Sequence, residues 1–182
     1  MKKSLLQITM IIPVILLLCF TFGCQQQIEE GITEAEAKAF IARDLEIWNE
    51  GNLAVVDELY DPDYARHYVD IFEDIVGIDA FKQWITDVRT AFPDFNITIE
   101  GEIIVKADKI VSRWIAEGTN VGSFLGLPPT GKKVKFFGVN ILHIVNGKVV
   151  EEWLYFNQAS LLQQLGFTLT PPQPPESPEE KK

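Results

Sequence analysis

Cysteine, histidine and basic side chains are scarce in this sequence of 182 residues. It has two cysteines and two histidines, and 16 Lys and Arg stand against 26 Asp and Glu, which gives a net charge of -10. Two cysteines exclude a disulfide scaffold and a cysteine-rich zinc module. A pI near 4.7 argues against binding to nucleic acid, which needs a basic face. The sequence also lacks a GxSxG motif, a P-loop and any internal repeat.

The N-terminus has the layout of a bacterial lipoprotein signal peptide over residues 1–23. Lys2 and Lys3 precede an apolar run, and a small residue stands directly before Cys24. The apolar run is short for a spanning helix, which needs ~20 such residues. An uncleaved anchor and an ordinary signal peptide are therefore the weaker alternatives. Cleavage before Cys24 would remove Cys19 and leave no free thiol.

A lipid on Cys24 would hold the protein at a membrane surface without a spanning helix. We therefore expect a lipid-anchored protein of the cell envelope with a short tether over residues 24–29. Gln25 favours the outer membrane if the source is Gram-negative, by resemblance to other lipoproteins. Residues 169–182 contain five of the ten prolines and predict an extended, solvated tail. The folded domain then covers residues 30–168.

Helical spacing of apolar residues predicts three helices in the first half of this domain. The first helix begins at Thr33, where Glu36 completes a capping box, and Gly51 ends it. The second follows Asn52 and ends in a turn at residues 61–63. Residues 65–70 suggest a short strand or an irregular edge. The third covers residues 79–92 and stops at a proline.

Beyond Phe95 the apolar period changes to two, which predicts four strands over residues 96–106, 109–119, 133–145 and 148–157. Tight turns at residues 107–108 and at Asn146-Gly147 join consecutive strands, and Gly101 and Gly138 suggest bulges or bends. A last short helix is expected near residues 161–165. The predicted class is α+β, with three N-terminal helices packed on a curved antiparallel sheet whose concavity suits a small ligand.

The C-terminal half resembles the SnoaL-like polyketide cyclase, or ester cyclase, family. The residues that carry the resemblance are Phe92-Pro93-Asp94, residues 118–119, residues 122–132 and residues 147–153. The resemblance covers about residues 30–168. It implies a cone-shaped domain of the cystatin-like, nuclear-transport-factor-two-like fold. It also implies intramolecular aldol chemistry on a small apolar carbonyl compound without a metal or another cofactor, through proton removal beside a carbonyl.

In the family a His in the third meander strand and an Asp further along serve this chemistry. His143 matches the first position, but Asn157 stands where the Asp is expected, and an amide cannot take up a proton. Either His143 acts alone as the acid/base, or the protein is a non-catalytic module that binds a lipophilic molecule. His67 is a further catalytic candidate, because relatives often have a His near this point. The spacing of the two histidines does not predict a metal site.

Several side chains of the strands are candidate ligand contacts. Arg113 either orients an anionic group or forms an ion pair with Glu102 or Glu117. The aromatic candidates either form the cavity wall or pack in the core or at a dimer interface; they are Trp114, Phe124, Phe137, Trp153 and Tyr155. The expected partners are a small hydrophobic molecule and a membrane surface. A homodimer through the sheet is a third role that the sequence leaves open.

Overall fold

The computed structural model describes residues 31–68, 73–168 and 170, which belong to one compact unit. The expected signal peptide, the tether and the tail apart from Thr170 lie outside the described residues. No helix within the described ranges is long and apolar enough to cross a membrane.

The helices form where the sequence predicts them. Thr33 caps the first through a complete capping box, in which the Glu36 N–H donates to Thr33 Oγ1 at 3.2 Å and the Thr33 N–H donates to Glu36 at 2.9 Å. Gly51 ends this helix in the left-handed conformation, with φ at 76°. The helices are α2 (Glu34–Glu50), α3 (Leu53–Leu59), α4 (Ile78–Ala91) and the C-terminal α5 (Gln158–Leu165).

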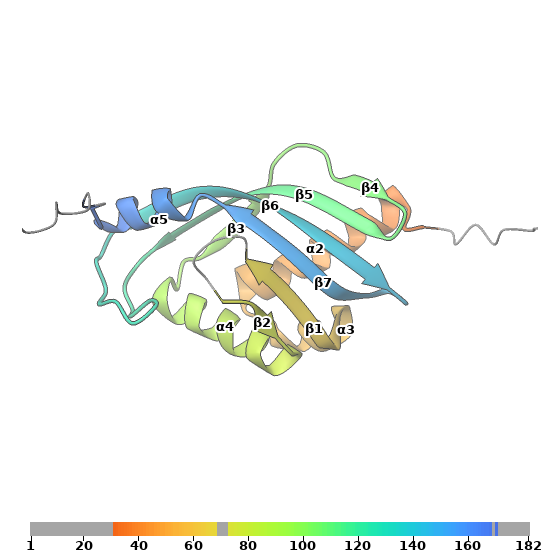
Figure 1. Ribbon diagram of the computed structural model, residues 1–182, viewed down its shortest axis with the longest axis horizontal. Coiled ribbons are helices and arrows are strands. Elements are labelled where there is room, and N and C mark those ends of the chain that lie inside the picture. Colours follow the sequence, from red (N-terminus) through yellow and green to blue (C-terminus); the bar gives the residue numbers. More distant parts are fainter. Residues whose placement is uncertain (1–30, 69–72, 169, 171–182) are drawn as a thin grey trace, which may run out of the picture. The chain divides into compact units, whose positions relative to one another are not determined.

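Seven strands form one curved sheet, in the order β2-β1-β7-β6-β5-β3 with β4 also paired to β5 (Figure 1). Neighbouring strands are antiparallel except for β1 and β7, which run parallel. The strands are β1 (Tyr60–Tyr68), β2 (Ile75–Val76), β3 (Asn96–Ile99), β4 (Ile104–Lys106), β5 (Lys109–Thr119), β6 (Lys133–Val145) and β7 (Lys148–Phe156). The predicted α+β class is confirmed, with a mixed rather than purely antiparallel sheet.

Two local predictions were wrong. The turn expected at residues 61–63 is part of β1, and a register shift between Tyr60 and Ala65 accommodates this irregular stretch beside β7. The strand expected over residues 96–106 is divided into β3 and β4, because Gly101 adopts a φ of 78° between them. The turns at Ala107 and Asn146 have positive φ as expected of tight hairpins.

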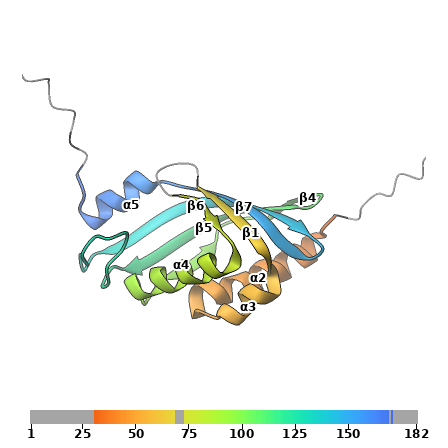
Figure 2. The ribbon, with the colours of Figure 1, turned by 60° about the horizontal axis from the view of Figure 1, so that its bottom comes forward.

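Helices α2, α3 and α4 cover one face of the sheet (Figure 2). In the central parts of β5, β6 and β7 the even-numbered side chains point toward these helices, and the odd-numbered ones point away. The core between the layers includes Tyr64 and Phe81, both fully buried, and Leu142. This division of the sheet into an inner and an outer face decides which predicted residues reach the cavity.

Candidate active site

A cavity lies between the inner face of the sheet and helices α2 and α4. Its volume is about 90 Å³, several times the roughly 10–15 Å³ that one water needs. Its walls are largely aromatic, and they include Trp48, Trp84, Phe92, Trp114, Phe124 and Phe136. A space of this shape and lining suits an apolar molecule.

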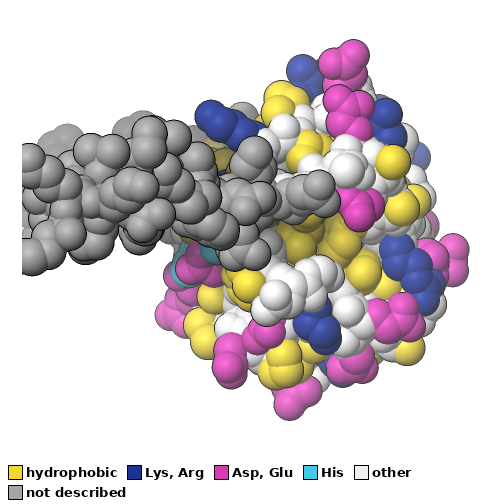
Figure 3. All heavy atoms as spheres, turned by 90° about the vertical axis from the view of Figure 1, so that its right-hand side faces the viewer, with side chains coloured by type: hydrophobic (Ala, Val, Ile, Leu, Met, Phe, Trp, Pro, Cys, Tyr) yellow, Lys and Arg dark blue, Asp and Glu magenta, His cyan; other side chains and the backbone are white. Residues whose placement is uncertain are grey.

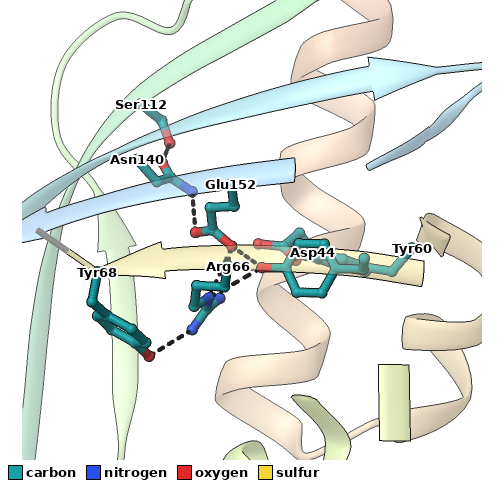
Figure 4. A network of polar contacts seen from close by, with 8 residues as sticks. Asp44, Tyr60, Arg66, Tyr68, Ser112, Asn140 and Glu152 are labelled. Atoms are coloured by element: carbon teal, nitrogen blue, oxygen red, sulfur yellow. Dashed lines mark hydrogen bonds and ion pairs between the residues drawn. The ribbon is translucent and has the colours of Figure 1, made fainter. Parts of the chain in front are cut away.

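Polar side chains gather at one part of the cavity, on five different elements (Figure 4). The sheet register creates this group, because Ser112 of β5 pairs with Asn140 of β6, and Arg66 of β1 pairs with Glu152 of β7. Asp44 joins them from helix α2. All five of these side chains line the cavity, although each is at most 8% exposed.

Glu152 has hydrogen-bond partners at both of its carboxyl oxygens. Arg66 donates to its Oε2 from Nη2 at 2.9 Å and from Nε at 3.1 Å, and Tyr64 also donates to this oxygen. Asn140 donates to Oε1 at 3.3 Å. The guanidinium lies over the ring of Trp48 at 5.0 Å. A buried ion pair with this many additional hydrogen bonds is a fixed structural unit.

The electrostatic environment of Asp44 differs from that of Glu152. The Tyr60 hydroxyl donates to Asp44 Oδ1 at 2.6 Å. Burial raises the pKa of Asp44 to about 7; the Tyr60 hydrogen bond opposes the rise, and the nearby charge of Glu152 adds to it. A carboxyl group with this pKa can both accept and donate a proton near neutral pH. Sequence reasoning missed it, although it is the one acid in the apolar stripe of its helix.

The two predicted catalytic histidines lie on the outer face, and neither lines the cavity. His143 Nε2 is 2.9 Å from Asp108 and its Nδ1 is 3.4 Å from Glu151. His67 Nδ1 is 2.8 Å from Asp74, and Nε2 is 3.8 Å from the same Glu151. The outer face of this sheet carries apolar side chains too, so the apolar neighbours of His143 do not mark the cavity.

Histidine atoms lie beside acidic side chains in the space-filling view from the right of Figure 1 (Figure 3). No three His, Cys, Asp or Glu side chains within the described ranges could hold a metal ion. His67 and His143 contact acidic side chains on the outer face of the sheet. Glu151 and Glu152 face opposite sides of the sheet, as the alternation of a strand requires.

The remaining predicted site residues divide between the two faces. Trp114 and Phe124 belong to the core and also line the cavity, so both of the roles considered for them apply. Phe137, Trp153 and Tyr155 are on the outer face, where Phe137 is 52% exposed and Tyr155 is 43% exposed.

Two polar predictions are also corrected. Arg113 is an exposed residue paired with Glu100 at 2.7 Å, and neither Glu102 nor Glu117 is its partner. Asn157 is the N-cap of helix α5, where its side chain accepts a hydrogen bond from the Ser160 N–H at 2.9 Å. Asn157 does not line the cavity.

Comparison with known proteins shows which family this sequence matches. Residues 40–165 match the model of the SnoaL-like polyketide cyclase family. The chain is 26% identical over 132 residues to the aklanonic acid methyl ester cyclase AcmA of Streptomyces galilaeus, covering 72% of this chain and 92% of that protein. It is 28% identical over 119 residues to the nogalonic acid methyl ester cyclase of Streptomyces nogalater, covering 65% of this chain and 89% of that one.

Solved structures share the fold. TsrD from Streptomyces laurentii superposes with a TM-score of 0.66 at 25% identity, over 74% of this chain and 98% of that one. An NTF2-like protein from Burkholderia pseudomallei has a TM-score of 0.61 at 17% identity, over 72% of this chain and 98% of that one. The nuclear-transport-factor-two-like fold expected from the sequence is therefore confirmed.

Proposed function

Because the chain belongs to the SnoaL-like polyketide cyclase family, we propose that it performs acid/base chemistry on a small, uncharged carbonyl compound held in the cavity. The reaction class is ring closure by intramolecular aldol condensation, or a related isomerisation. The observation that carries this proposal is the combination of aromatic walls with a buried carboxyl, Asp44, whose pKa is raised to about 7. Proton removal beside a carbonyl needs such a group in a place that excludes water.

The charges in the cavity favour a neutral substrate. Among the described residues that line it, Arg66 is the one cation, and the carboxylate of Glu152 neutralises it at 2.9 Å. An anionic ligand would therefore meet no available positive charge and would lose its hydration. Both curated relatives are cyclases of methyl esters by name. An ester without a free carboxylate is the kind of molecule that this cavity would accept.

The test uses aklanonic acid methyl ester and the corresponding free acid as probes. Incubation with the purified protein should convert the ester to an isomer of equal mass and different retention in liquid chromatography, and the acid should react far more slowly. A Leu154→Trp variant, which places an indole in the cavity, should lose the activity. Val145→Trp, at an exposed outer position, should keep it. Equal rates for ester and acid would contradict the charge argument.

A second candidate function is ligand binding without turnover. Two observations favour it: the family's expected Asp is replaced by Asn157, and His143 lies outside the cavity. In that case native mass spectrometry of protein purified from its own host would find a lipophilic molecule bound, and the ester would bind unchanged. Conversion of the ester would rule this role out.

The proposed location is a membrane surface of the cell envelope, with a lipid on Cys24. The support is the signal-like sequence of residues 1–23 and the small residue before Cys24. Intact-mass analysis of membrane-extracted protein should show loss of residues 1–23 and added acyl chains. A Cys24→Ser variant should lack the lipid, and an unmodified N-terminus in the parent protein would refute the assignment.

We also propose a homodimer through the outer face of the sheet. Its support is the exposure of apolar side chains there, with Phe137 52% and Tyr155 43% exposed on adjacent strands. Val139 pairs with Tyr155 across the same two strands, which continues the apolar surface. Burying such a patch against a second copy would remove it from water.

A further inference from the structure

We infer that Asp44 is the catalytic base of this cavity: it takes a proton from a carbon beside a carbonyl group and returns it to the product. This assignment deepens the proposed function and rests on it. The family pattern of a His and an Asp, which falls on His143 and Asn157 in this sequence, does not include Asp44. A base in this cavity must have an oxygen atom that a bound ligand can reach.

One oxygen of the Asp44 carboxyl is left available. The Tyr60 hydroxyl donates its hydrogen bond to Oδ1. Within the described ranges, no side-chain oxygen that is sealed from solvent lacks a hydrogen-bond partner. Since Asp44 lines the cavity, Oδ2 is open to a molecule bound there. A base must be within hydrogen-bond reach of the proton it removes, and this oxygen satisfies that condition.

The other titratable groups near the cavity either have hydrogen-bond partners at all their oxygens or keep their protons. Glu152 accepts hydrogen bonds at both oxygens, from Arg66 at Oε2 and from Asn140 at Oε1. Burial raises the pKa of Tyr60, Tyr64 and Tyr68 above the usual range, so all three keep their protons at neutral pH. Of the two described carboxyl groups that line the cavity, Asp44 is therefore the one with an oxygen left for a bound ligand.

Tyr60 is the positioning residue for this carboxyl. Its own side chain is 1% exposed, and its ring packs edge-on against Tyr64 with the centroids 4.8 Å apart. A fixed hydroxyl that donates to Oδ1 orients the carboxyl and directs Oδ2 to the ligand. The same hydrogen bond stabilises the ionised form, which lowers the pKa relative to burial alone.

The reaction step balances without a cofactor. Ionised Asp44 accepts the proton, and the electrons of the C–H bond form an enolate. The enolate carbon attacks a second carbonyl carbon of the same molecule, so a C–C bond forms while the π electrons of that carbonyl move to its oxygen. The resulting alkoxide takes the proton back from the Asp44 carboxylic acid. The product is an isomer of the substrate, and Asp44 is ionised again.

The test compares Asp44→Asn with the control Asp87→Asn, which changes an exposed acid on helix α4. The amide oxygen that Asp44→Asn introduces can still accept the Tyr60 hydrogen bond, which preserves the local structure. Conversion of aklanonic acid methyl ester should fall at least about 100-fold in Asp44→Asn, the usual contribution of a general base. Its affinity, followed by quenching of tryptophan fluorescence, should stay within about threefold. Asp87→Asn should match the parent protein.

An independent readout does not need turnover. In protein labelled with ¹³C at aspartate carboxyls, one carboxyl should titrate near pH 7. That resonance should vanish in Asp44→Asn and remain in Asp87→Asn. If the parent protein ignores the ester, the proposed function fails for this substrate. The inference is then judged by this titration alone, and the absence of a carboxyl that titrates near neutrality would overturn it.

If Asp44→Asn converts the ester at nearly the parent rate, the inference is wrong and the proposed function survives. Tyr60→Phe covers the case in which Asp44→Asn does not fold. It removes the hydrogen bond that lowers the pKa of Asp44, so the acid limb of the pH–rate profile should move to higher pH. An unmoved acid limb in Tyr60→Phe would also overturn the assignment.

Discussion

Arg66 and Glu152 form an ion pair at 2.9 Å, and their side chains are only 3% and 2% exposed. The two residues are 86 positions apart in the chain, and they meet because β1 lies parallel to β7 with Arg66 opposite Glu152. This pair links strands β1 and β7 inside the sheet, beside the edge strand β2. It also supplies the fixed charges beside which Asp44 lies.

We expect Arg66→Leu to lower the free energy of unfolding by about 3–5 kcal/mol, because it leaves the Glu152 charge buried without its partner. Urea denaturation followed by tryptophan fluorescence measures this loss. The double variant Arg66→Leu, Glu152→Leu should lose clearly less than the sum of the two single variants, since no charge is then stranded. Strict additivity of the two losses would contradict this account.

Asp44 should make the stability of the protein depend on pH in a defined window. Its pKa is about 7 in the folded state, above the ~3.9 of an unfolded chain, so folding takes up a proton between these values. Its contribution is fully present below about pH 3.9 and is lost as the pH rises to about 7, at about 1.4 kcal/mol per pH unit. The difference in unfolding free energy between the parent protein and Asp44→Asn, measured by urea denaturation from pH 4.5 to 8, should decline to pH 7 and then level off.

Gly138 should not tolerate a side chain. A methyl group at this position of β6 would overlap the indole of Trp114. Trp114 lies opposite Gly138 on the neighbouring strand β5, and its side chain lines the cavity. We expect Gly138→Ala to lower the free energy of unfolding by about 1–3 kcal/mol and to weaken ligand binding, because the indole must move. Gly101→Ala is the control: there is open space around it, so its cost of about 1–3 kcal/mol comes from positive φ alone and should leave binding unchanged.

The outer face gives a prediction about assembly. Phe137→Lys should convert a dimer to a monomer in light scattering coupled to size-exclusion chromatography, because it places a charge within the apolar surface. Val76→Lys replaces an even more exposed apolar side chain, on the edge strand β2, and should leave the mass unchanged. A parent protein that is monomeric at micromolar concentration would exclude this dimer.

The local pattern of the sequence was sufficient for most of the elements. The capping box at Thr33, the stop at Gly51 and the Asn146-Gly147 turn each depend on neighbouring residues, and the structure contains all three. Residues 61–63 were misjudged because their strand conformation depends on pairing with β7, almost 90 positions later. Pairing between segments this far apart leaves no local periodic signal.

The set of residues that form the site depended on tertiary structure more than the helices and strands did. A strand period of two shows that His143 and Leu142 face opposite sides, but it does not show which side the helices cover. Both faces of this sheet carry apolar residues, so hydrophobicity alone did not identify the inner one. Asp44 was visible as an acid in an apolar stripe, yet its raised pKa arises from burial by segments distant in the chain.

The sequence by itself determined the fold class, the helix and hairpin signals and the resemblance to cyclases, since these depend on short-range pattern and on motif residues. Only the tertiary structure decided which side chains share the cavity. It placed Trp114 and Phe124 inside, and it placed His67 and His143 outside. It also brought Asp44 to the ion pair of Arg66 and Glu152, because helix packing and strand register set those distances.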